Sequence, residues 1–151
     1  MLISDKQAEN ALDAALEKIG SPYQWGGNGP DAFDCSGLIV YSYQKALGKD
    51  KIFKIGEMTV ADVAMDHLYN YNVQLLPLEK VKTGDIIFLT DSDERITHGG
   101  LFIEWVDDSF QEFKFIHASS YYGKVLVDTW AIDDNYSSQW FVGAGRLKLV
   151  Y

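Results

Sequence analysis

In the first twenty residues, apolar positions recur among polar ones with the period of an α-helix. One face collects apolar side chains at spacings of three and four residues: Ala8, Leu12, Ala15 and Ile19. This spacing is typical of an amphipathic helix that packs one side against a core. Ser4 or Asp5 is a suitable N-cap, and Gly20 is a suitable stop. The pattern therefore predicts a helix over residues 5–19.

Two further helices are expected in the first half of the chain. Residues 35–47 offer a set of apolar side chains for a buried side: Leu38, Ile39, Tyr41 and Leu47. Gly48 follows as a C-terminal stop. Residues 60–69, VADVAMDHLY, predict a shorter helix with Thr59 as its cap. The segment between the first two helices, residues 23–33 (YQWGGNGPDAF), reads as a glycine-rich loop.

The second half of the chain changes to short runs of β-branched and aromatic residues separated by turn residues. These runs predict strands over residues 84–90, 99–106, 112–119, 124–130 and 141–150. Because the gaps between them are short enough for hairpins, we expect an antiparallel sheet of about five strands. Helices followed by strands predict an α+β fold. A length of 151 residues suits a single domain, residues 1–151.

Charge and composition exclude several classes of function. The formal net charge is −9, so a surface that neutralises nucleic-acid phosphates is not expected. No apolar run is long enough to span a bilayer, and the first ten residues show no basic segment followed by an apolar stretch, so no secretory signal is predicted. A single cysteine excludes an internal disulfide and a cysteine-rich zinc site. No metal or organic cofactor is implied.

The single cysteine follows an aspartate at the start of a predicted helix. Unpaired backbone N–H groups and the helix dipole favour a thiolate at such a position, so Cys35 is a candidate nucleophile with a lowered pKa. His98 and His117 lie in two predicted strands that are consecutive in the chain. If these strands pair as a hairpin, the two imidazoles share one face. His98 can then meet the sulfur, and His117 can hold the far nitrogen of His98.

Each of these residues also has a purely structural interpretation. A lone cysteine is often inert packing, His98 can be a polar residue at a strand end, and His117 can be a core histidine bonded to a carbonyl. His67 lies in a predicted helix and is interpreted as solvated or partly buried, and Trp25 as packing. The carboxylates in DSDER and VDD do not follow the ligand spacing of a calcium loop, so solvated turns are the preferred interpretation.

Four segments together resemble a known family: YQWGGNGPDAFDCSGLIVYSY, KTGDIIFL, THGGLFIE and FIHAS. They are similar to the NlpC-type cell-wall endopeptidases, which are papain-like cysteine peptidases, and the resemblance covers about residues 8–147. It implies a cysteine helix packed on an antiparallel sheet. Cys35 then matches the nucleophile, His98 the base and His117 the residue that orients the base.

The resemblance also implies a substrate and further site residues. Tyr23 matches a tyrosine whose hydroxyl lies beside the cysteine, and Asp34 and Ser36 match positions that help to recognise the acyl side of the peptide. The implied substrate is a peptidoglycan stem peptide, often cut between D-γ-glutamyl and a diamino acid through a thioester. One departure is Gly99, which stands where the family often has a β-branched residue and predicts a looser strand.

Two other functions remain open at this point. The domain can be a binding or structural module with weak catalysis, for example a phage tail component. It can also transfer an acyl group or cleave a γ-glutamyl amide outside the cell wall. The compatible settings are a phage lysin or tail enzyme, which we rank first, a cytoplasmic recycling enzyme and an exported effector. The sequence leaves the oligomeric state open.

Overall fold

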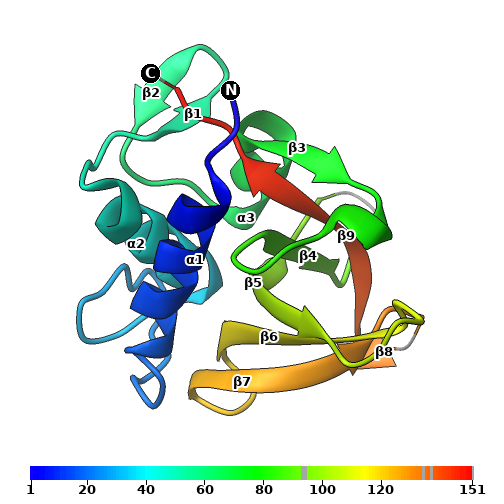
Figure 1. Cartoon of the computed structure of the whole chain (residues 1–151). Helices are drawn as coiled ribbons and strands as arrows, with labels where there is room; N and C mark the ends of the chain where they lie inside the picture. Colours follow the sequence, from blue (N-terminus) through cyan, green and yellow to red (C-terminus); the bar gives the residue numbers. More distant parts are fainter. Residues whose placement is uncertain (93–94, 134, 137, 151) are drawn as a thin grey trace.

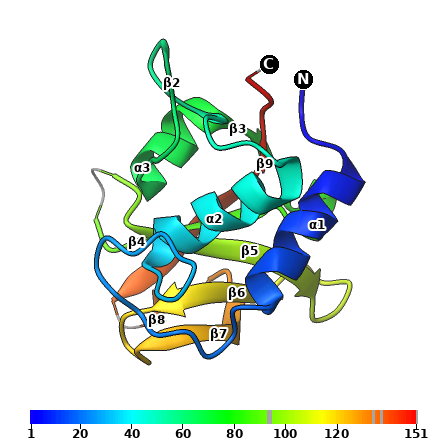
Figure 2. The ribbon, with the colours of Figure 1, turned by 90° about the vertical axis from the view of Figure 1, so that its left-hand side faces the viewer.

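The computed structural model describes residues 1–92, 95–133, 135–136 and 138–150. Two helices, α1 (Asp5–Leu16) and α2 (Cys35–Leu47), pack together on one side of the sheet (Figures 1 and 2). The α1 helix ends earlier than the sequence predicts. Ile19 is exposed instead of buried, because the chain turns at Gly20, whose N–H donates to the carbonyl of Val125 at 2.9 Å. The end of α1 is thus set by a contact with a strand that follows much later.

The main sheet is antiparallel throughout, which confirms the predicted α+β class. Within the described residues it has seven strands, in the order β3-β9-β4-β5-β6-β7 with β8 paired to β9. The strands are β3 (Val73–Leu76), β4 (Ile86–Thr90), β5 (His98–Trp105), β6 (Glu112–Ser119), β7 (Lys124–Ala131), β8 (Asn135–Tyr136) and β9 (Gln139–Leu147). The expected number was about five, because the short strands β3 and β8 give no clear alternation in the sequence.

Both faces of the sheet are buried against different partners. On the helix side, Ile116 and Leu101 join the core that α1 and α2 complete. On the other side, the sheet curls so that Phe102, Phe113 and Phe115 form a second core. Side chains alternate along a strand, so His117 falls on the Phe115 side, away from Ile116. The two rings of Phe115 and His117 are stacked, with 4.5 Å between their centroids.

The predicted helix over residues 60–69 is wrong in its first half. Val60 ends a hairpin of β1 (Phe53–Ile55) and β2 (Met58–Val60), in which Thr59 pairs with Lys54, and residues 61–64 form neither helix nor strand. Gly56 at its turn has a φ of 61°, a conformation that glycine adopts without steric cost. The helical part begins only at α3 (Met65–His67) and continues as the π-helical turn Leu68–Asn72. A 3-10 turn, Leu78–Lys80, precedes β4.

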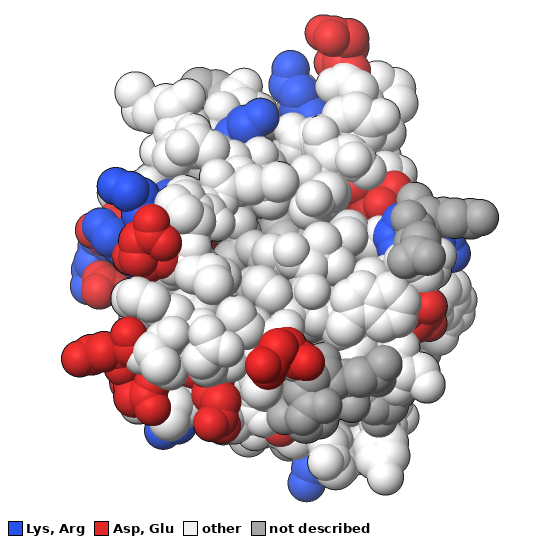
Figure 3. Space-filling view, turned by 90° about the vertical axis from the view of Figure 1, so that its right-hand side faces the viewer, with Lys and Arg blue, Asp and Glu red and all other residues white. Residues whose placement is uncertain are grey.

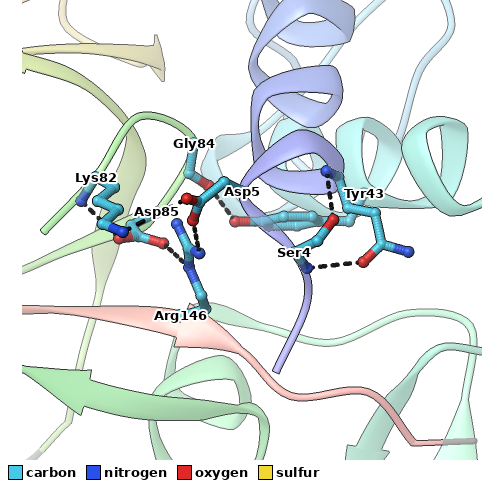
Figure 4. Close-up of polar contacts among 8 residues, drawn as sticks. Ser4, Asp5, Tyr43, Lys82, Gly84, Asp85 and Arg146 are labelled. Atoms are coloured by element: carbon cyan, nitrogen blue, oxygen red, sulfur yellow. Dashed lines mark hydrogen bonds and ion pairs between the residues drawn. The ribbon is translucent and has the colours of Figure 1, made fainter. Parts of the chain in front are cut away.

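A buried arginine joins the last strand to the first helix (Figure 4). The Nε of Arg146 donates to Asp85 Oδ1 at 2.7 Å, and its Nη1 donates to Asp5 Oδ1 at 2.5 Å. The hydroxyl of Tyr43, on α2, donates to the carbonyl of Gly84 at 2.5 Å. These bonds fix both helices to the loop that starts β4. The helices therefore keep a defined position over the sheet.

The surface follows the acidic composition. On the face that Figure 3 shows, most of the Asp and Glu side chains lie toward the edges, together with several Lys and Arg, and a broad central area carries neither sign of charge. In the described part of the chain, no helix has the length and apolar character needed to cross a membrane.

Candidate active site

The start of α2 is held by its N-cap, Asp34. Its Oδ1 accepts from the Gly37 N–H at 2.7 Å and from the Ser36 hydroxyl at 3.3 Å. Its Oδ2 accepts from the Gly26 N–H at 3.0 Å, in the glycine-rich loop. Asp34 therefore caps the helix and fastens the loop to it, and Cys35 becomes the first helical residue.

The start of β5 lies beside this first helical turn (Figure 2). The thiol of Cys35 donates to the carbonyl oxygen of Thr97, with 3.8 Å between sulfur and oxygen. Thr97 directly precedes His98. Cys35 and His98 both line a cleft of about 570 Å³, which we call the thiol cleft. The sequence predicts a contact between the Cys35 sulfur and the imidazole of His98. In the described residues the hydrogen bond from this sulfur goes instead to the Thr97 carbonyl.

The two predicted histidines are brought together by the hairpin of β5 and β6. His98 Nε2 lies 2.8 Å from His117 Nδ1, and the strands pair antiparallel. The prediction that both imidazoles share one face of this hairpin is confirmed.

A residue that the sequence analysis missed extends this pair. His117 Nε2 lies 3.2 Å from Asp128 Oδ2, on β7, and the same oxygen accepts from Trp130 Nε1 at 3.1 Å. The hydrogen bond from His117 lowers the pKa of Asp128, which is therefore a carboxylate at neutral pH. The alternation of side chains along a strand could have revealed it. Leu126 pairs with His117 across the β6–β7 ladder, and Asp128, two residues further on, lies on the same face as Leu126.

The hydrogen bonds assign the tautomers of both rings. An ionised carboxylate only accepts, so His117 donates through Nε2 to Asp128. With that proton on Nε2, the Nδ1 of His117 is the acceptor, and His98 donates to it through Nε2. The lone pair of His98 is consequently on Nδ1, the nitrogen that remains to act as a base.

Two consecutive glycines allow the strands to approach closely here. A Cβ on Gly99 would lie 2.3 Å from the Ile87 carbonyl oxygen and 2.4 Å from Met65 Cε. A Cβ on Gly100 would lie 2.2 Å from the carbonyl oxygen of Ile116. The expectation that Gly99 loosens the strand is wrong, because it is buried and paired in the β4–β5 ladder.

The protonation states differ from those predicted for an ionised pair. Burial, together with the charge of Asp34, raises the pKa of the Cys35 thiol to about 12, although the N–H groups of Ser36 and Cys35 act in the opposite direction. Burial and repulsion by His117 lower the pKa of His98 to about 3. At neutral pH the free protein therefore holds a thiol and a neutral imidazole. Desolvation at this site outweighs the effect of the helix end.

The family is decided by comparison with known sequences. The model of the NlpC/P60 family matches residues 20–146. This chain belongs to the NlpC/P60 family.

Relatives of this NlpC/P60 chain carry endopeptidase names. It is similar to the murein DD-endopeptidase MepH of Escherichia coli, with 29% identity over 146 residues that cover 94% of this chain and 46% of that protein. A probable endopeptidase of Corynebacterium glutamicum is 62% identical over 34 residues, or 22% of this chain and 16% of that protein. The chain thus spans less than half the length of these relatives.

Solved structures agree with the fold. An NLP/P60 family protein of Staphylococcus aureus, described as similar to lipoprotein, superposes with a TM-score of 0.64 at 26% identity, covering 97% of this chain and 43% of that one. The NlpC/p60 domain of the peptidoglycan hydrolase SagA gives a TM-score of 0.62 at 23% identity, covering 91% of this chain and 97% of that domain. The latter likeness concerns the fold alone.

The remaining candidates of the NlpC/P60 site divide into two groups. Tyr23, Asp34 and Ser36 line the thiol cleft, and burial followed by the charges of Cys35 and Asp34 raises the pKa of the Tyr23 phenol. Trp25 also lines this cleft and is 87% exposed, so its interpretation as packing is wrong. His67 does not line the cleft, and its Nδ1 accepts from the Ala64 N–H at 3.1 Å.

The acidic turns show no sign of a calcium loop where they are described. Asp107 accepts hydrogen bonds from the N–H and the hydroxyl of Ser109, as in a local turn. Asp93 and Glu94 of the DSDER segment lie outside the described residues. Within the described ranges, no cluster of three histidine, cysteine or acidic side chains is arranged to hold a metal ion.

Alkylation of Cys35 tests the protonation state. A thiol whose pKa is raised stays protonated below that pKa, so the thiolate fraction keeps growing with pH up to about 12. The iodoacetamide rate is therefore expected to rise about tenfold per pH unit from pH 7 to 10, without levelling near the free-cysteine value of about 8.5. Intact-protein mass spectrometry measures the rate, with N-acetylcysteine as the control. A plateau below pH 8.5 would instead identify a thiolate stabilised by His98.

Proposed function

We propose that this chain is a cysteine endopeptidase that hydrolyses amide bonds in the stem peptides of peptidoglycan. The observation that carries the proposal is that Cys35 and His98 line one cleft, with His98 hydrogen-bonded to His117 and His117 in turn to Asp128. A thiol, a base and groups that orient the base are the requirements for acyl chemistry through a covalent intermediate. The endopeptidase names of relatives support the choice of substrate class.

In the proposed mechanism the pair is activated by proton transfer. His98 Nδ1 takes the proton of the Cys35 thiol as the sulfur attacks the scissile carbonyl. The oxyanion that forms is stabilised by the backbone N–H of Cys35 at the helix start and by the hydroxyl of Tyr23. The His98 imidazolium then gives its proton to the leaving amine, which departs and leaves a thioester on the sulfur.

Hydrolysis completes the cycle. The neutral His98 removes a proton from water, and the resulting hydroxide attacks the thioester. The acid is released and the thiol is restored. His117 keeps the ring aimed, and the Asp128 carboxylate stabilises the pair of rings while His98 carries the positive charge.

The bond that we propose is the one between D-γ-glutamyl and the diamino acid of the stem peptide. Asp34 and Ser36 line the cleft on the side of the thiol and are our candidates for contact with the acyl half. Because the Asp34 carboxylate also caps α2, its replacement would disturb both binding and the helix start.

Digestion of purified peptidoglycan tests this function. Wild type and Cys35→Ala are incubated with peptidoglycans that contain either lysine or diaminopimelate, and the new termini are identified by mass spectrometry. Wild type is expected to release fragments that gain one water at the γ-glutamyl bond. Fragments that gain an amine would assign acyl transfer instead. Binding without any cleavage would identify a non-catalytic module and overturn the proposal.

Asp128 is expected to act as a positioning residue. Asp128→Ala should lower kcat by about 10- to 100-fold, the range for loss of an outer-shell carboxylate that orients a histidine. KM should change little, because the residue acts through His117. Asp128→Asn keeps an acceptor for His117 and should recover part of the rate. Nitrogen NMR of the histidines checks the cause: the His117 tautomer should change in Asp128→Ala, and an unchanged tautomer would contradict this role.

A further inference from the structure

The short helix α3 contacts the start of β5 both before and after His98 in the chain. Asp66 Oδ1 accepts a hydrogen bond from the Ile96 N–H at 2.9 Å. Met65 Cε lies 2.4 Å from the place that a Cβ on Gly99 would take, so its methyl group packs directly against the Gly99 backbone. Both α3 residues line the thiol cleft. The residue that carries the base is therefore flanked by two contacts with α3.

Residues 95–97 form the segment that leads into the base, and its bonds come from few sources. Within the β4–β5 hairpin, the Thr97 N–H donates to the Leu89 carbonyl at 3.2 Å. From outside this hairpin, in the part of the chain that the structure describes, the segment is bonded by the Asp66 carboxylate and by the Cys35 thiol. The thiol bond is long, at 3.8 Å, whereas a backbone N–H that meets a carboxylate makes one of the stronger hydrogen bonds. Asp66 is thus the main polar anchor of this segment outside its own hairpin.

The helix that carries Asp66 is itself fixed by a buried side chain. Asn72 is 1% exposed, and its Nδ2 donates to the carbonyls of His67 and Lys54, each at 2.9 Å. Its Oδ1 accepts from the Lys54 N–H at 2.7 Å. These bonds tie the end of α3 to β1. Asp66 therefore projects from an anchored element, as a side chain that must hold another group in place requires.

The position of the segment sets the geometry of the reacting pair. Thr97 presents the carbonyl that accepts from the Cys35 thiol, and the next residue, His98, carries the imidazole that takes the thiol proton in the proposed mechanism. The far side of this ring is fixed separately, through its bond to His117. A shift of the backbone before His98 would therefore move the base relative to the sulfur. Misplacement by about 1 Å can lower a rate about 100-fold.

We propose that Asp66 is a positioning residue: through the Ile96 N–H it holds the start of β5 where the His98 imidazole can take the proton of the Cys35 thiol. This inference rests on the proposed function and adds a residue to it. Asp66 acts as a hydrogen-bond acceptor in a fixed place, so the position of its oxygen is required and its negative charge is not. Direct contact with a cationic group of the substrate would instead require the charge.

Three substitutions separate the acceptor from the charge. Asp66→Ala removes both and should lower kcat for stem-peptide hydrolysis about 10- to 100-fold, with little change in KM. Asp66→Asn removes the charge, keeps an oxygen in place for the Ile96 N–H and should retain most of the rate. Asp66→Glu keeps the charge but moves the oxygens by one methylene, so its kcat should fall below that of Asp66→Asn.

A matched control removes the same kind of bond elsewhere. Asp107 also accepts from a backbone N–H, that of Ser109, in the turn beyond the opposite end of β5, and Asp107→Ala should match wild type. Asp66→Glu more active than Asp66→Asn, or a rise in KM with kcat retained, would assign the charge or a substrate contact and overturn the positioning role. Circular dichroism checks that each variant is folded.

Two NMR signals test the inference without substrate. The Ile96 amide proton should exchange slowly with solvent in wild type and Asp66→Asn, and about tenfold faster in Asp66→Ala and Asp66→Glu, because its acceptor is lost or displaced. The proton on His98 Nε2, which is bonded to His117, should be sharp in the first two proteins and broadened or shifted in the others. A wild-type His98 signal in Asp66→Ala or Asp66→Glu would overturn the role, even if the rate falls. Absence of cleavage by wild type would overturn the proposed function instead, and these signals would still decide whether Asp66 positions His98.

Discussion

Replacement of Cys35 by alanine is expected to reduce kcat/KM for stem-peptide hydrolysis by about 10⁴-fold or more, because loss of the nucleophile removes the covalent route altogether. The sulfur makes one long hydrogen bond, to the Thr97 carbonyl, so the fold should be retained. The rate is measured from product release by chromatography, and circular dichroism reports the fold.

Cys35→Ser is the stricter control for this result. A hydroxyl nearly reproduces the shape and the hydrogen bond of the thiol, but it is a much weaker nucleophile. We expect Cys35→Ser to be as inactive as Cys35→Ala while binding substrate like wild type. Hydrolysis that persists in both variants would exclude the cysteine mechanism, even if peptidoglycan is the substrate.

Replacement of Arg146 by methionine is expected to lower the free energy of unfolding by about 3–5 kcal/mol, the usual effect of breaking a buried ion pair from one side. Asp85 is fully buried and accepts from Arg146 Nε at 2.7 Å. Burial already raises the pKa of the Asp85 carboxyl, and without the guanidinium its charge has no compensation. Urea denaturation followed by tryptophan fluorescence measures the change.

Two further variants identify the cause of that loss. Lys82→Met removes an exposed ion pair with Asp5 and should leave stability unchanged, since such pairs contribute little. Arg146→Met combined with Asp85→Asn should recover part of the loss, because the stranded charge is gone and the Lys82 N–H still finds an acceptor oxygen at position 85. An equal loss in the single and the combined variant would mean that packing, and not charge, dominates.

The parts of the fold that the sequence predicted well depend on local signals. The α2 helix begins and ends at the predicted residues because Asp34 supplies a side-chain cap and Gly48 adopts the left-handed conformation. The β6 strand also has the predicted bounds, 112–119. The pairing of the two histidines followed from a short hairpin and strand alternation, both of which are readable from sequence.

The parts that were missed depend on tertiary contacts. Thr59 and Val60 were predicted as the cap and the first residue of a helix, but pairing with β1 places both in a strand. Asp128 belongs to no motif that the sequence shows, and only the pairing of β7 with β6 brings it beside His117. The pKa of Cys35 depends on the burial of the thiol and on the charge of Asp34. The prediction of a lowered pKa considered only the position of Cys35 at the start of a helix.

The hydrogen bonds that join Asp128, His117 and His98 cross three neighbouring strands, one residue from each. A slip of β6 by a single position would turn His117 toward the helices and present Ile116 in its place. Such a molecule could keep its secondary structure and much of its burial while losing the general base. Turnover therefore reports on strand alignment more sensitively than circular dichroism does, and refolded samples of this protein are best judged by specific activity per accessible thiol.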